Sequence, residues 1–225
     1  MSPNPFRHRA VPYVLPFAVF LCILGLRSYL HVPEIALFSG WIVVVGAVLA
    51  LVSRPVIDLK LRRPLATIAL GVGVFVVWIA PDLLFPGYRS HWLFQNSITG
   101  ALNASITQAG RTDGLIIALR LIRAALLVPI VEELFWRAFL MRWAIRPDFE
   151  SVPLGTYEAR SFWIVAVLFA TEHGPYWDVG LAAGALYNWW MVRTRSLGDL
   201  IWAHAITNAC LCVYVLAAGK WEYWM

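Results

Sequence analysis

Three ionisable side chains lie inside a long apolar segment, and their spacing separates two chemical roles. Glu132, Glu133 and Arg137 belong to the run Gly114 to Trp143, which is long enough to cross a bilayer as a helix. A charge such as Arg at the bilayer centre costs about 2.5–3.5 kcal/mol on insertion scales, so it is kept where it is paired, faces a wet cavity or does chemistry. Glu133 and Arg137 are spaced i, i+4 and can pair on one helical face, whereas Glu132 is turned about 100° away. We therefore expect Glu133 to be a structural carboxylate and Glu132 to be free for catalysis.

Two later apolar segments each carry a polar pair at helical spacing. The sequence FATEH places Phe169 and His173 one turn apart, and HAITN does the same for His204 and Asn208. A single histidine in a membrane helix is more often a structural hydrogen-bonding group than a catalyst, and an asparagine can join helices in the same way. Structural hydrogen bonding between helices does not by itself explain three such patterns on three separate segments. We expect one cavity to collect Glu132, His173, His204 and Asn208.

Other polar groups in the apolar segments have structural interpretations. Glu172 is expected at a helix end or at the rim of the cavity, and Asp199 reads as a first-turn acid favoured by the helix dipole. Three cysteines lie in apolar runs and have no metal-ligand spacing to a histidine, namely Cys22, Cys210 and Cys212. We therefore expect each of them to serve as a small buried hydrophobic side chain.

The composition is that of a membrane protein. Of 225 residues, 60% are hydrophobic and 14% charged, and mean hydropathy is +0.69. We predict one domain over residues 1–225, an all-α polytopic transmembrane helix bundle of about seven spans, with an eighth if a re-entrant or further segment exists. The spans are expected near 11–30, 35–53, 65–85, 115–142, 161–175, 178–193 and 197–218.

Glycines and loops add two local expectations. Gly71 with Gly73, and Gly180 with Gly184, permit close contact between helices. The polar stretch 86–113 is expected to hold a short amphipathic helix near an entrance.

The basic residues predict the orientation. With the N-terminus in the cytoplasm, inner segments hold eleven of the Lys and Arg residues. Five fall on the outer side, namely Arg89, Arg111, Arg120, Arg123 and Lys220. Arg7 and Arg9 precede a retained first span, because no small-residue cleavage site follows. No basic cluster interleaved with aromatic residues favours nucleic-acid binding.

The three patterns resemble the motifs of the CAAX prenyl endopeptidase family of intramembrane proteases, whose large bacterial branch is often called CPBP or Abi. They match as EELFWR (Glu132 to Arg137), FATEH (Phe169 to His173) and HAITN (His204 to Asn208), and RTRSL (Arg193 to Leu197) resembles the stretch before the last motif. The likeness covers about residues 115–216. Ala138 stands where many members have Gly. The layout of the first three spans is similar to that of the bacterial subgroup associated with exosortase and PEP-CTERM protein sorting.

The resemblance implies a glutamate-dependent peptidase that needs no obligatory cofactor. Glu132 would be the general base and later acid, and His173 would hold and polarise the attacking water. His204 and Asn208 would donate hydrogen bonds to the oxyanion, while Glu133, Arg137 and Phe169 support the site. The substrate would be a membrane-associated or lipid-tethered protein or peptide, cut near its C-terminus, in the bacterial cytoplasmic membrane.

Three alternatives stay open. Glu132, His173 and His204 could hold zinc for the same reaction, although the His-Glu-x-x-His pattern of soluble metalloproteases is absent. The protein could instead be a non-catalytic bacteriocin-immunity or protein-sorting component. The third alternative is a small transporter that uses the carboxylates as a proton relay. The absence of a sequence repeat between the two halves of the chain argues against it.

Overall fold

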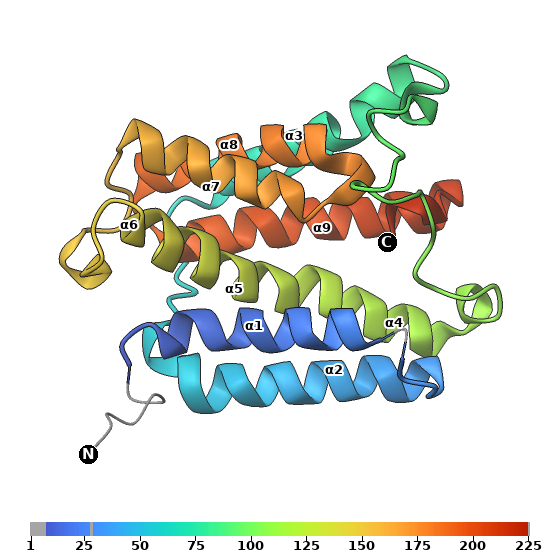
Figure 1. Ribbon diagram of the computed structural model, residues 1–225, viewed down its shortest axis with the longest axis horizontal. Helices are drawn as coiled ribbons and strands as arrows, with labels where there is room; N and C mark the ends of the chain where they lie inside the picture. Colours follow the sequence, from blue (N-terminus) through green and yellow to red (C-terminus); the bar gives the residue numbers. More distant parts are fainter. Residues whose placement is uncertain (1–7, 28, 225) are drawn as a thin grey trace.

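A computed structural model of the protein describes residues 8–27 and 29–224, and these residues form a helical bundle (Figure 1). The longer helices are α1 (Val11–Leu26), α2 (Glu34–Val48), α3 (Pro64–Leu84), α7 (Ala159–Thr171), α8 (Trp177–Thr194) and α9 (Leu197–Ala218). A further continuous helix consists of α4 (Gly114–Ile122), a π-helical stretch Arg123–Leu127, α5 (Val128–Glu133), a second π-helical stretch Leu134–Leu140 and α6 (Met141–Trp143). The all-α class is confirmed: no strand occurs in the described part of the chain.

Helices occupy each of the seven ranges in which the sequence predicts a span. Four segments are long and apolar enough to cross a membrane, namely Glu34–Val56, Pro64–Leu84, Gly114–Trp143 and Leu197–Ala218. The first of these continues α2 through a π-helical turn (Leu49–Ser53) and a 3-10 turn (Arg54–Val56). Val11–Leu26 and Ala159–Thr171 are apolar but shorter. The number of spans therefore stays a prediction.

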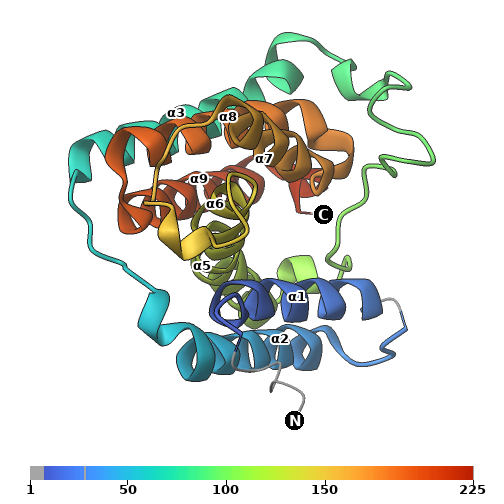
Figure 2. The same ribbon diagram turned by 60° about the vertical axis from the view of Figure 1, so that its left-hand side comes forward.

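The helix α4–α6 runs through the middle of the bundle. Figure 2 shows it nearly end-on, with α1 and α2 on one side and α3, α7, α8 and α9 on the other. Its start is fixed by Asp113, whose side chain accepts hydrogen bonds from the backbone N–H groups of Leu115 (2.8 Å) and Ile116 (3.2 Å). The central helix therefore faces both halves of the molecule.

Two other helix starts carry side-chain caps. Glu158 accepts from the backbone N–H groups of Arg160 and Ser161 before α7, and the Ser196 hydroxyl accepts from the Asp199 N–H before α9. The predicted first-turn position of Asp199 is confirmed. The FATEH pattern begins at the end of α7 and the HAITN pattern lies within α9, so these caps fix the starts of the two helices that position both patterns.

The prediction of a short amphipathic helix in 86–113 is wrong. That segment contains only single 3-10 turns at Tyr88–Ser90 and Gly110–Thr112. The Asn96 side-chain oxygen accepts from the backbone N–H groups of Ile98 (2.8 Å) and Thr99 (3.1 Å), and Gly100 has φ +82°. Such local side-chain bonds compete with helical hydrogen bonds, so the chain turns instead of coiling.

Candidate active site

The central helix changes its winding on both sides of the two glutamates. Glu132 and Glu133 end the short α-helical stretch α5, which lies between the π-helical stretches Arg123–Leu127 and Leu134–Leu140. Single π-helical turns inside α-helices are frequent at functional sites. Here they set the directions in which the two neighbouring carboxylates leave the helix.

Glu133 forms the expected ion pair and one unexpected bond. Both of its oxygens lie 3.1 Å from Arg137 Nη1, and both side chains are fully buried. Its Oε1 also lies 2.8 Å from His204 Nδ1, on α9. A carboxylate at Nδ1 holds that proton and leaves Nε2 to face outward. Glu133 therefore orients His204 as well as pairing with Arg137.

Arg137 joins the central helix to α7 and α8. Its Nε donates to Asn188 Oδ1 (2.9 Å), and its Nη2 donates to the Gly184 carbonyl (3.3 Å). Its guanidinium carbon lies 4.4 Å from the centre of the Phe169 ring. The expected close contact at Gly184 is confirmed, because a Cβ there would come within 3.2 Å of the Ala166 carbonyl oxygen and of the Phe169 ring.

His204 and Asn208 share one face of α9, as their spacing predicts. The His204 ring stacks on Tyr187, with centroids 5.0 Å apart. Asn208 Nδ2 donates to the Ala124 carbonyl at 2.8 Å. That carbonyl lies in the first π-helical stretch of the central helix. One amide hydrogen of Asn208 is thus used between helices, and the second is left for another acceptor.

His173 is held by the end of α7. Its Nδ1 lies 2.8 Å from the Phe169 carbonyl oxygen, which fixes the proton on Nδ1. Glu172 closes α7 as its C-cap and accepts a hydrogen bond from Trp136 Nε1 (3.1 Å), so its predicted place at a helix end is confirmed. The predicted contact at Gly180 is confirmed too, since a Cβ there would lie 3.2 Å from His173.

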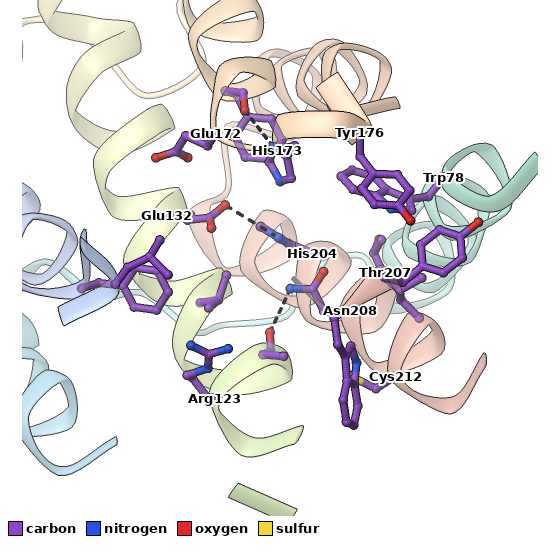
Figure 3. A pocket seen from close by; sticks show the side chains of 18 of the residues that line it. Trp78, Arg123, Glu132, Glu172, His173, Tyr176, His204, Thr207, Asn208 and Cys212 are labelled. Atoms are coloured by element: carbon purple, nitrogen blue, oxygen red, sulfur yellow. Dashed lines mark hydrogen bonds and ion pairs between the residues drawn. The ribbon is translucent and has the colours of Figure 1, made fainter. Parts of the chain in front are cut away.

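All four expected residues line one cavity of about 480 Å³. Glu132 comes from α5, His173 from the turn that follows α7, and His204 with Asn208 from α9 (Figure 3). Glu132 is 9% exposed, its Oε2 has no hydrogen-bond partner, and this atom lies 4.0 Å from His204 Nε2. Glu172 also lines the cavity. The arrangement gathers a free carboxylate, two imidazoles and an amide around a space that can hold a ligand.

The structure also shows contacts that the sequence pattern did not indicate. Asp199 Oδ1 accepts from the backbone N–H groups of Arg62 (2.6 Å) and Arg63 (3.2 Å), which ties α9 to the start of α3. Arg120 and Arg123, which the charge count assigned to the outer side, are buried in the central helix and line the cavity. The apolar run around both arginines was the feature of the sequence that could have indicated their position inside the helix.

A comparison with protein-family models assigns the region that holds the site. Residues 114–210 match the family described as type II CAAX prenyl endopeptidase Rce1-like. This region belongs to the CAAX protease-like family. The family is one of proteases, and the helices long and apolar enough to cross a membrane indicate an integral membrane protein that carries this protease-like region. Searches of the curated proteins and of the solved structures gave no match.

The CAAX protease-like region has no preformed metal cluster in the described residues. Within 8–27 and 29–224, no three His, Cys, Asp or Glu side chains are grouped so that they could hold a metal ion. The family is not typically dependent on a cofactor.

Proposed function

We propose that the protein hydrolyses a peptide bond near the membrane surface, close to the C-terminus of a membrane-associated or lipid-tethered protein. The observation that supports this most is the buried Glu132 Oε2, which lacks a hydrogen-bond partner and faces a cavity shared with His173, His204 and Asn208. A carboxylate oxygen in this position is costly to keep unless a ligand or water uses it.

Glu132 would act as the general base. It takes a proton from a water molecule, whose oxygen attacks the peptide carbonyl carbon, and it later returns the proton to the leaving amine. His173 holds its proton on Nδ1 against the Phe169 carbonyl, so its Nε2 is an acceptor. That nitrogen would accept the second hydrogen of the same water and direct its lone pair toward the substrate.

His204 and Asn208 would stabilise the oxyanion. The free amide hydrogen of Asn208 is one donor. His204, held at Nδ1 by the Glu133 carboxylate, would be the second donor through Nε2 when its ring carries both protons. Removing one oxyanion donor costs about 10²–10³ in kcat in characterised enzymes.

The charges of the loops support the proposed orientation in the membrane. We propose the bacterial cytoplasmic membrane, the exosortase-associated subgroup, and a cytoplasmic N-terminus. Arg9 lies 3.7 Å from Asp148 and 3.6 Å from Glu150, so the N-terminal segment and the loop after α6 share one end of the bundle (Figure 1). With Arg120 and Arg123 inside the central helix, the excess of basic residues at that end is larger than the sequence indicated.

Cysteine labelling of intact cells tests the orientation. In a background without Cys22, Cys210 and Cys212, a membrane-impermeant maleimide is expected to label Ser97→Cys and to leave Ser151→Cys unlabelled until the cells are opened. Both serines are exposed, so accessibility alone does not separate them. The reverse labelling pattern would place the N-terminus outside.

Cleavage by the purified protein in liposomes tests the activity. The assay compares wild type with Glu132→Gln on membrane-anchored peptides and proteins encoded nearby, with and without a chelator. We expect cleavage that Glu132→Gln abolishes and the chelator leaves unchanged. Chelator-sensitive cleavage restored by added zinc would instead favour the zinc-dependent version. No cleavage by a folded wild type across the set would favour a non-catalytic immunity or sorting role.

A further inference from the structure

A buried cation lines the cavity at the end opposite Glu172 and His173. Arg123 begins the first π-helical stretch, is 6% exposed, and lies with its guanidinium 4.2 Å from the centre of the Trp41 ring and 5.4 Å from that of Phe38. Its Nε has no hydrogen-bond partner, and no carboxylate in the described part of the chain forms an ion pair with it. Aromatic faces offset only part of the cost of burying a full charge. An anion supplied by a ligand would complete this site.

Arg123 and Glu132 are at a fixed separation, because both belong to the central helix. Nine residues at about 1.5 Å each place their Cα atoms about 13 Å apart. An extended peptide covers about 3.3–3.6 Å per residue, so three or four residues span this distance. Figure 3 shows Arg123 on the far side of Glu132 and His204 from Glu172 and His173, facing the same cavity.

The wall between the two ends is mostly apolar. Ala124, Val128, Leu211 and Cys212 line it. An ionic contact in such surroundings is much stronger than in water, because little solvent screens it. The planar guanidinium offers two parallel N–H donors, which match the two oxygens of a carboxylate.

We propose that Arg123 binds the free C-terminal carboxylate of the peptide substrate. The peptide bond three or four residues before that carboxylate would then lie at Glu132. This inference rests on the proposed peptidase function and adds to it the residue that recognises the chain end.

A binding experiment tests the proposal without requiring cleavage. Full-length Glu132→Gln protein in detergent is incubated with peptides that carry a hydrophobic anchor and four randomised C-terminal residues. Each peptide is made with a free carboxylate and with a carboxamide, distinguished by an isotope label in the anchor. Mass spectrometry of the retained peptides gives the acid-to-amide ratio. We expect the acid to be enriched about ten-fold or more, since a charge-assisted hydrogen bond is worth about that factor.

Variants at two arginines locate the effect. Adding Arg123→Gln is expected to bring the ratio to about one, and Arg123→Lys to give an intermediate value because it keeps the charge without the fork. Arg142→Gln is the control, because Arg142 is also buried on the central helix but donates to the Ala138 carbonyl and is not part of the cavity wall. We expect this control to keep the full ratio.

Three results would overturn the assignment. The first is equal retention of acid and amide, and the second is an acid preference that survives Arg123→Gln. The third is the loss of co-purified phosphatidylglycerol in Arg123→Gln without any acid preference, which would assign Arg123 to a lipid phosphate. If the wild type cleaves nothing but the acid preference depends on Arg123, the peptidase proposal fails while carboxylate binding stands.

Discussion

At Glu133, one carboxylate serves two partners. It pairs with Arg137 on its own helix and holds the Nδ1 proton of His204 on α9. The motif spacing predicts the first contact, because both residues lie one turn apart. The second joins residues 71 positions apart and depends on how α9 packs on the central helix. The residue expected to be structural therefore also positions a member of the candidate site.

The two adjacent glutamates are expected to respond differently to loss of charge. Glu133→Gln leaves Arg137 buried without a counter-charge, and breaking such a pair costs about 3–5 kcal/mol of stability. Glu132→Gln removes no ion pair of comparable closeness and is expected to change the melting temperature little while ending cleavage. Thermal unfolding in detergent, with cleavage measured on the same samples, checks both. Equal melting temperatures would contradict this division of roles.

Asn208 has a structural and a proposed catalytic hydrogen bond, and kinetics separates them. Asn208→Ala is expected to lower kcat about 10²–10³-fold with KM nearly unchanged, as when one oxyanion donor is lost. Loss of the bond to the Ala124 carbonyl alone would lower the melting temperature and leave kcat per folded molecule intact. Steady-state kinetics on variant protein of known folded fraction gives the answer.

Among the helices, two glycines on α3 that look alike in the sequence have different surroundings. A Cβ on Gly71 would lie 2.6 Å from the Ala203 carbonyl oxygen and 2.8 Å from Ile206, both on α9. A Cβ on Gly73 would meet nothing within 4 Å. Thr207 also donates to the Gly71 carbonyl at 2.8 Å. Only Gly71 therefore sets the distance between α3 and α9.

Alanine at these two positions should have opposite effects. Gly71→Ala is expected to destabilise by about 1–3 kcal/mol, the usual range for overpacking, and to displace the α9 backbone next to His204. Gly73→Ala is the matched control and should be neutral or slightly stabilising, because Ala favours helix by about 1 kcal/mol over Gly. Melting temperatures in the same detergent decide between them, and a similar drop in both would rule out the contact as the cause.

The sequence predicts those features of the helices that depend on local pattern. Apolar runs locate the seven helical ranges, and i, i+4 spacing places His204 with Asn208 and Glu133 with Arg137 on common faces. The changes in winding around Glu132 have no such local signature. The loop 86–113 was misjudged because Asn96 bonds to its own backbone. Arg123 was counted on the outer side although it falls within the expected span 115–142, because a charge count does not show which way a side chain faces.

At the scale of the whole molecule, one wall of the cavity comes from the first helix. Phe17, Phe20, Leu21 and Leu24 of α1 line the same space as His204 and Asn208 of α9. Leu21 and Leu24 are 40% and 38% exposed, so this wall reaches the surface of the bundle. The first helix, which lies outside the matched family region, is therefore expected to form the access path for substrate.

A bulky residue on that path should hinder binding and spare the chemistry. Leu24→Trp is expected to raise KM about ten-fold with little change in kcat, since it narrows the cavity far from the reacting atoms. Leu26→Trp is the control: Leu26 is 54% exposed and is not among the residues that line the cavity. Equal kinetics for the two variants would show that substrate does not pass along this face of α1.

The charges along the central helix also give the cavity a direction. Glu132 with Glu172 marks one end as acidic, and Arg123 marks the other as basic. A peptide has its own polarity from amino to carboxyl terminus, and only one of its two orientations matches this field. A peptide attached to its anchor through the carboxyl terminus would have the same side chains but would present an amino group to Arg123. Chain direction would thus be selected before any side chain of the substrate is recognised.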